Sequence, residues 1–284
     1  MRTVCLFVPG NNPAMLQNAD VFGADAVILD LEDAVAVAEK DAARELLKEY
    51  LKTWDFGKLE VMVRVNSLAS GWLEADLEAV VCEKLAAIVY PKAAVEVLYD
   101  VDDLLSRVET RKGLERKIGI VPIVETAQGV VETDDLVYMP RIEGVLLGAE
   151  DLAADMEFER TKEGAELAYP RARVAFACRS EEIASIDTPF TDVNDEIGLE
   201  RDARTAKSLG FTGKAVIHPN QIETVRRVFA PTEAEIRWAT RILSAAKEAD
   251  RKGLGAFSLD GRMVDRPIVV RAEKILLRAG VEKP

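Results

Sequence analysis

Residues 118–125 read Ile-Gly-Ile-Val-Pro-Ile-Val-Glu, and residues 144–151 read Gly-Val-Leu-Leu-Gly-Ala-Glu-Asp. In each stretch a carboxylate, Glu125 or Asp151, comes just after an apolar run of strand length. Packing gives a poor explanation for a carboxylate at that place. Acids that follow neighbouring strands of an α/β protein can converge on one hard metal ion. These two stretches therefore predict a parallel α/β fold with a metal site where the strands end.

The same alternation of short apolar runs and longer amphipathic segments recurs along the chain. The eight strand candidates are Thr3–Val8, Ala26–Leu29, Val61–Val65, Ala87–Tyr90, Ile118–Val124, Gly144–Leu147, Ala184–Ile186 and Lys214–Ile217. Helices are expected at Glu39–Leu51, Leu73–Leu85, Asp100–Val108 and Leu199–Leu209. Eight such units predict an α/β fold of the (β/α)8 TIM-barrel type. An open doubly wound sheet is the alternative, but residues 8–12 match its Gly-rich phosphate turn poorly.

A different pattern follows the last predicted strand. Residues 232–235 have the form of a capping box, so a helix is expected from there to about Arg251. Asp260-Gly261 between apolar runs is a strong hairpin signal. Asp265-Arg266-Pro267 opens a last helix through Leu277. The chain is therefore expected to form a helix–hairpin–helix extension beyond the barrel.

We place the barrel in residues 1–230 and the extension in residues 231–284. The 284-residue chain has a net charge of −13, which argues against nucleic acid or an anionic membrane as its main partner. Three scattered cysteines without a CxxC pair argue against a disulfide framework and a zinc site, and fit a reducing cytoplasm. Neither a signal peptide nor a membrane span is expected. The single histidine, His218, excludes a mechanism that needs two.

Active sites of this fold lie at the carboxyl ends of the strands. Acids dominate the residues expected there, with Arg64 and Lys92 among them. A divalent cation neutralises such an acidic edge most easily, and ligands that are all oxygen suit Mg²⁺ or Mn²⁺ rather than zinc. Glu125 and Asp151 are the candidate ligands. A merely solvated acidic rim is the alternative.

Arg64 ends a run of β-branched residues and is expected to be partly buried. Its planar fork could hold a carboxylate through two parallel hydrogen bonds, or it could form a structural ion pair with the barrel's own acids. Asp30, Glu32 and Asp33 follow the second strand. They are candidates for holding metal-bound water, although each could instead cap the next helix.

Two further polar residues each allow two interpretations. His218, which precedes Pro219, is expected to satisfy a backbone carbonyl rather than to act as a base. Asp265 stands two residues before Pro267 and could simply cap the last helix.

Six motifs follow one another in order over essentially the whole chain. They are Phe-Val-Pro-Gly at 7–10, Leu-Asp-Leu-Glu-Asp at 29–33, Val-Arg-Val-Asn at 63–66, Pro-Ile-Val-Glu-Thr at 122–126, Gly-Ala-Glu-Asp-Leu at 148–152 and Ala-Val-Ile-His-Pro-Asn-Gln at 215–221. With residues 187–190 and 198–200, this series resembles the citrate lyase beta subunit family of the HpcH/HpaI aldolase superfamily, which includes malyl-CoA and citramalyl-CoA lyases. The resemblance implies a Mg²⁺-dependent carbon–carbon lyase, usually a homotrimer or hexamer.

Residue roles are carried over from the family to the matching positions. The resemblance implies that Glu125 and Asp151 bind the metal and that Arg64 clamps the substrate carboxylate, with Glu125 also near the substrate. Asp265 matches a catalytic aspartate that such lyases deliver from a neighbouring subunit's tail. The extension over 231–284 is therefore expected to pack on a neighbouring subunit.

The implied substrate is a carboxylated β-hydroxyacyl-CoA of the malyl-, citramalyl- or citryl-CoA type. It would be cleaved to an acyl-CoA and a 2-oxo acid, or formed in the reverse Claisen-type addition. Pro9, Gly148 and Pro189 are expected to contact it. A thioesterase, a free 2-oxo-acid aldolase and a subunit active only with an acyl carrier protein are alternatives. Residues 11–15 lack the basic side chains that several CoA-using relatives carry there.

Overall fold

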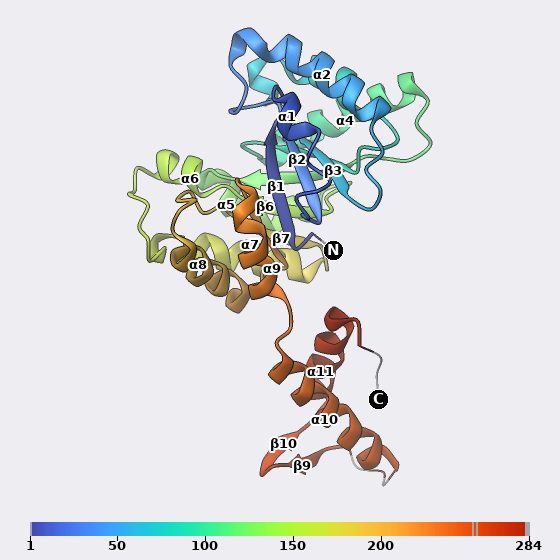
Figure 1. The fold of residues 1–284 in the computed structure, drawn as a ribbon, viewed down its shortest axis with the longest axis vertical. Helices are drawn as coiled ribbons and strands as arrows, with labels where there is room; N and C mark the ends of the chain where they lie inside the picture. Colours follow the sequence, from blue (N-terminus) through green and yellow to red (C-terminus); the bar gives the residue numbers. More distant parts are fainter. Residues whose placement is uncertain (1, 252, 254, 282–284) are drawn as a thin grey trace. The chain divides into compact units, whose positions relative to one another are not determined.

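The computed structural model describes residues 2–251, 253 and 255–281. Eight parallel strands pair in chain order, and β8 pairs with β1 to close the barrel (Figure 1). The strands are β1 (Val4–Pro9), β2 (Ala26–Asp30), β3 (Glu60–Arg64), β4 (Ala87–Tyr90), β5 (Gly119–Val124), β6 (Gly144–Leu147), β7 (Ala184–Asp187) and β8 (Gly213–Val216). The predicted TIM barrel is therefore confirmed, and each predicted strand lies within one residue of the observed one.

Helices connect the strands and cover the outside of the sheet (Figure 1). They are α1 (Pro13–Leu16), α2 (Lys40–Thr53), α3 (Leu73–Val80), α4 (Val95–Lys112), α5 (Ala127–Leu136), α6 (Ala149–Met156), α7 (Ala168–Ser180) and α8 (Glu196–Leu209), with 3-10 turns η1 (Val37–Glu39), η2 (Leu68–Ser70), η3 (Ala165–Leu167) and η4 (Pro219–Gln221). Helix α3 ends five residues earlier than predicted, because Val81 adopts an extended conformation. Helix α4 continues until Gly113 ends it with φ 70°.

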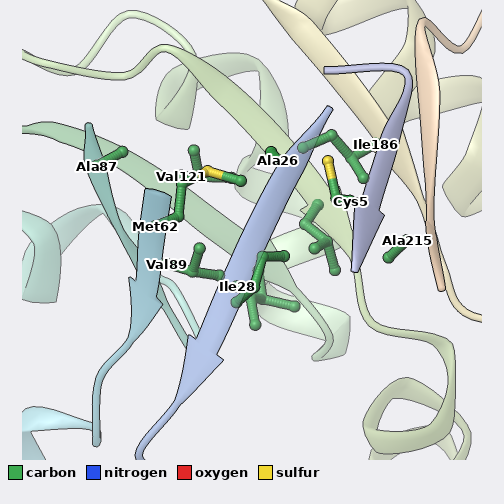
Figure 2. Packing of buried hydrophobic residues seen from close by; sticks show 11 residues of the cluster. Cys5, Ala26, Ile28, Met62, Ala87, Val89, Val121, Ile186 and Ala215 are labelled. Carbon is green, nitrogen blue, oxygen red and sulfur yellow. The ribbon is translucent and has the colours of Figure 1, made fainter. Parts of the chain in front are cut away.

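The barrel interior is filled by apolar side chains that reach the axis from all eight strands (Figure 2). Its core residues are Cys5, Ala26, Ile28, Met62, Ala87, Val89, Val121, Ile123, Leu146, Ile186 and Ala215. All of these side chains are fully or almost fully buried, so the barrel is a packed core rather than a channel. Within the barrel this layer leaves room for polar side chains beyond it, at the strand ends.

The chain divides between Arg226 and Arg227 into two compact units. Helix α9 (Ile222–Phe229) spans the boundary, and the second unit holds α10 (Glu233–Arg251), β9 (Phe257–Leu259), β10 (Arg262–Val264) and α11 (Arg266–Ala279). That the extension packs on a neighbouring subunit stays a prediction.

Local signals in the second unit behave as the sequence predicts. The Thr232 backbone N–H donates to Glu235 at 2.8 Å, and the Glu235 N–H donates back to the Thr232 hydroxyl at 3.2 Å, which completes a capping box. Asp260 and Gly261 have φ of 51° and 75°, as a two-residue hairpin turn requires. The unit has its own apolar core, made of Ala239, Ile242, Leu243, Val264, Ala272 and Leu276. In the part of the chain that the structure describes, no helix is long and apolar enough to cross a membrane.

Candidate active site

The period-two alternation of strand side chains directs charged groups into the mouth of the barrel. On three strands a core residue faces the axis, and the polar residue two positions later faces the same way. These pairs are Ile28 and Asp30, Met62 and Arg64, and Ile123 and Glu125. The carboxyl ends of β2, β3 and β5 therefore supply two acids and a guanidinium to one space.

A cavity of about 460 Å³ opens at this end of the barrel. Eight of the ten predicted site residues line it: Pro9, Asp30, Asp33, Arg64, Glu125, Gly148, Asp151 and Pro189. Of the other two, Glu32 forms an ion pair with Arg64, and Asp265 belongs to the second unit. Most residues singled out from the sequence are thus brought together, although their separate roles stay predictions.

Glu125 is a buried acid of the cavity and is 3% exposed. The Lys92 backbone N–H donates to its Oε1 at 2.7 Å. Gly148 lies directly against it, since a Cβ at position 148 would be 2.5 Å from Oε2, so glycine is needed for this approach. Burial, and after it the neighbouring Asp151 carboxylate, raises the pKa of Glu125 to about 8.

Asp151 projects from the first turn of α6, whose N-terminal residue Ala149 donates its N–H to the Thr188 hydroxyl at 3.1 Å. The Asp151 carboxylate is 38% exposed, and Lys92 Nζ lies 3.7 Å from its Oδ1. Mg²⁺ is usually held by one or two carboxylates and keeps several waters. Among the described residues no group of three or more His, Cys, Asp and Glu is arranged to hold an ion. Two mutually repelling carboxylates beside an open cavity fit Mg²⁺, with water or substrate oxygens as the other ligands.

Arg64 forms the ion pair that the sequence left open as an alternative. Its Nε and Nη2 donate to Asp30 at 2.8 and 2.6 Å, and Nη1 lies 3.0 Å from Glu32. The guanidinium also stacks 5.3 Å from the centre of the Phe7 ring. Burial would lower the pKa of Arg64, but the hydrogen bond and charge of Asp30, with Glu32 and Asp33, raise it, so the group stays charged. The guanidinium also lines the cavity, so its role as a carboxylate clamp stays a prediction.

The three acids after β2 have different surroundings. Asp30 is nearly fully buried and accepts hydrogen bonds from the backbone N–H groups of Glu32 and Ala34 at 2.9 and 3.2 Å. It therefore holds both the loop after β2 and the Arg64 side chain. Burial, opposed by Arg64, raises the pKa of Glu32 to about 7. The Asp33 side chain is 65% exposed. That any of them holds metal-bound water stays a prediction.

The expected contact of His218 with a backbone carbonyl is wrong for the described residues. Its Nδ1 lies 3.2 Å from the Asn220 backbone N and 2.7 Å from the Asn220 Oδ1, so the ring caps η4. Asp265 stands at the N-cap position of α11, yet within the described chain its carboxylate accepts no capping hydrogen bond. The capping interpretation of Asp265 therefore lacks its defining contact.

Sequence reasoning missed a buried group of four charged residues, which we call the β7–β8 ion network: Arg171, Asp187, Asp202 and Lys214. Arg171 holds Asp187 through two hydrogen bonds of 2.9 and 3.0 Å. Lys214 Nζ donates at 2.6 Å to Asp187, to Asp202 and to the Thr188 carbonyl. The signal that could have revealed it was Lys214, a lysine at the start of an otherwise apolar strand.

Comparisons with known proteins agree with this geometry. A family model described as HpcH/HpaI aldolase/citrate lyase matches residues 3–219, and one described as a carbon–carbon bond lyase of the TIM-barrel fold matches residues 159–281. The citrate lyase subunit beta of Leuconostoc mesenteroides subsp. cremoris is 41% identical, over 97% of this chain and 92% of that protein. The mitochondrial citramalyl-CoA lyase of Rattus norvegicus is 34% identical, over 98% and 86%. A crystal structure of CitE from Mycobacterium tuberculosis with magnesium, acetoacetate and coenzyme A is 32% identical, with a TM-score of 0.82 and 98% of both chains covered.

Proposed function

The chain belongs to the HpcH/HpaI aldolase/citrate lyase family, and on that premise we propose that it is a Mg²⁺-dependent carbon–carbon lyase acting on a coenzyme A thioester. Its substrate is a carboxylated β-hydroxyacyl-CoA, which is cleaved to an acyl-CoA and a 2-oxo acid. The observation that carries the proposal is the Glu125–Asp151 pair, which faces the same cavity as the Arg64 guanidinium. That arrangement would provide a cation site and an anion site in one cavity.

Glu125 and Asp151 would hold the cation through their carboxylate oxygens. A bound Mg²⁺ would supply Lewis-acid polarisation of the substrate's oxygens. The pKa of Glu125, raised to about 8 by burial, favours its protonated form at neutral pH in the absence of a cation. The fixed Oε1 contact with Lys92 and the close approach of Gly148 keep this carboxylate in one orientation.

Arg64 would bind the carboxylate that becomes part of the 2-oxo acid. Asp30 occupies Nε and one hydrogen of Nη2, and Nη1 pairs with Glu32 at 3.0 Å and Asp33 at 3.5 Å. A substrate carboxylate would therefore take the second Nη2 hydrogen and compete with these two acids for Nη1. Asp265 would accept the proton of the substrate hydroxyl. The carbon–carbon bond then breaks, its electron pair moves to the thioester as an enolate, and protonation of that enolate releases the acyl-CoA.

Loss of the metal ligands is the direct test. Glu125→Gln and Asp151→Asn should each remove most Mg²⁺ affinity in a calorimetric titration, and EDTA should abolish cleavage of malyl-, citramalyl- and citryl-CoA until Mg²⁺ is restored. Mn²⁺ is expected to substitute for Mg²⁺, because both accept oxygen ligands. Full activity in the presence of the chelator would reject the metal-dependent mechanism.

We place Asp265 in trans, within a closed oligomer that is most simply a trimer. Asp265→Asn should keep Mg²⁺ and oxo-acid binding but lose turnover, because asparagine cannot take the hydroxyl proton. Mixed subunits of Asp265→Asn and Arg64→Ala, each inactive alone, should recover partial activity, since hybrid oligomers contain some intact sites. An active Asp265→Asn variant, or a fully active monomer, would contradict this assignment.

A second candidate is a subunit that takes its thioester from an acyl carrier protein. It is favoured by residues 11–15, which carry no basic side chain; there Asn11 donates instead to Glu39 at 2.6 Å. Product assays with free CoA thioesters distinguish the two candidates. Cleavage that appears only after a carrier subunit is added would support the second.

A further inference from the structure

Lys92 contacts both of the predicted metal ligands. Its backbone N–H donates to Glu125 Oε1 at 2.7 Å, and its Nζ lies 3.7 Å from Asp151 Oδ1. The residue follows β4 after a single proline. Because the two contacts come from different parts of one residue, the backbone orients one ligand while the side chain places a positive charge beside the other.

The backbone of Lys92 is left-handed, with φ of 47°. This conformation costs a residue that has a Cβ about 1 kcal/mol or more, whereas glycine adopts it freely. Such conformations persist where the surrounding structure requires them, and they cluster at functional sites. The N–H bond to Glu125 requires only the backbone, so glycine would serve that contact with less strain. The lysine side chain therefore calls for a separate explanation.

The charges around the cavity supply that explanation. We call the seven groups at this edge the rim cluster: Asp30, Glu32, Asp33, Glu125 and Asp151 with Arg64 and Lys92. Arg64 lies on the side of Asp30, Glu32 and Asp33, so Lys92 is the base that faces Asp151. With Glu125 protonated, the form favoured without a cation, the other four acids and the two bases leave the ionised cluster with two negative charges.

We propose that Lys92 is the internal counter-ion of this cluster. Its ammonium pairs with Asp151 until a divalent cation binds that carboxylate, and the ammonium then attracts the anionic substrate. This inference rests on the proposed metal site at Glu125 and Asp151. The ammonium and the cation repel each other, so Lys92 weakens metal binding. The same charge offsets the acids that surround the substrate carboxylate, so Lys92 strengthens oxo-acid binding.

Removal of the charge should therefore move two affinities in opposite directions, a result that simple loss of packing would not produce. Lys92→Met keeps the length and the Cβ of the side chain but removes its charge. In titration calorimetry with Mg²⁺ alone, Lys92→Met should bind about tenfold more tightly than the wild type. Pyruvate titrated into the Mg²⁺-saturated protein should bind about tenfold more weakly. Both shifts should shrink at high salt, because ions screen a half-exposed charge.

Two controls separate charge from structure. Lys92→Arg keeps the charge and should return both affinities to within about threefold of the wild type. Lys52→Met makes the same chemical change on α2, where Lys52 is 72% exposed and pairs only loosely with Glu49 at 3.6 Å, and it should change neither affinity. Thermal unfolding of each variant verifies that it is folded.

Mg²⁺ affinity that is unchanged or weaker in folded Lys92→Met would overturn the inference, as would unchanged pyruvate affinity. If the wild type binds no divalent cation, the proposed metal site itself falls and the inference falls with it. The wild-type titration therefore distinguishes the two failures.

Discussion

Two groups of charged side chains adjoin the barrel strands and differ in the balance of their charges and in the direction they face. The β7–β8 ion network joins two cations to two acids, none more than 13% exposed, and it faces α7 and α8 outside the sheet. The rim cluster joins five acids to two bases, and five of its seven groups line the cavity. A buried group with equal numbers of cations and acids is neutral without an added ion, whereas an open group with excess acids favours a cation from outside.

The largest effect should come from breaking the balanced network. Lys214→Met leaves Asp187 and Asp202 buried with Arg171 as their remaining cation, and the loss of one buried partner typically costs about 3–5 kcal/mol. The free energy of unfolding in urea should fall by that amount. Lys48→Met, at an exposed pair with Glu45, should change it by less than about 1 kcal/mol. If Lys214→Met lowered the free energy of unfolding by as little as Lys48→Met, the network would contribute little to stability.

A smaller but functional effect is expected in the rim cluster. Arg64→Lys keeps the charge but cannot hold Asp30 through two bonds and still present a planar edge to the substrate. We expect kcat/KM to fall on the order of 10²-fold, equivalent to about 2.7 kcal/mol. The free energy of unfolding in urea should change less in Arg64→Lys than in Lys214→Met. Activity within about threefold of the wild type would leave Arg64 with its ion-pair role alone.

The smallest effect concerns pH. Burial alone would raise the pKa of Asp202, but the Lys214 ammonium and the Arg171 guanidinium outweigh it and hold that pKa below its usual value. An acid whose pKa is lowered by folding stabilises the protein above its unfolded pKa, and this contribution is lost as the pH falls through the folded pKa. Wild-type stability should therefore decrease below about pH 4.

Asp202→Asn removes the titrating group from the network. The loss of unfolding free energy between pH 6 and pH 3 should then be smaller than in the wild type by on the order of 1 kcal/mol. Equal losses in the two proteins, measured by urea unfolding at each pH, would show that Asp202 does not contribute to the acid sensitivity.

Local sequence was sufficient for the elements and for the identity of most site residues. Strand-length apolar runs, the capping box at Thr232 and the Asp260-Gly261 turn depend on neighbours within a few positions, so they are visible in the chain itself. Because active sites of a barrel lie at the strand ends, the acids there could be named without a structure. The six spaced motifs additionally indicated the family to which the chain belongs.

Only the tertiary structure decided where each charged side chain points and what it contacts. The strands of a parallel barrel are buried on both faces, so their continuous apolar runs carry no alternation that would reveal the inward face. Asp187 and Lys214 adjoin the core residues Ile186 and Ala215 and therefore point outward, whereas Glu125 lies two residues after Ile123 and points inward.

The decisive partners are also distant in sequence. Arg64 meets Asp30 across 34 positions, and Lys92 meets Glu125 across 33. Closure of the barrel brings such residues together, and no local pattern encodes that proximity. The sequence by itself determined the barrel and the chemistry available at its edge, while folding divided that chemistry into a balanced network between sheet and helices and an acidic site open to a cation.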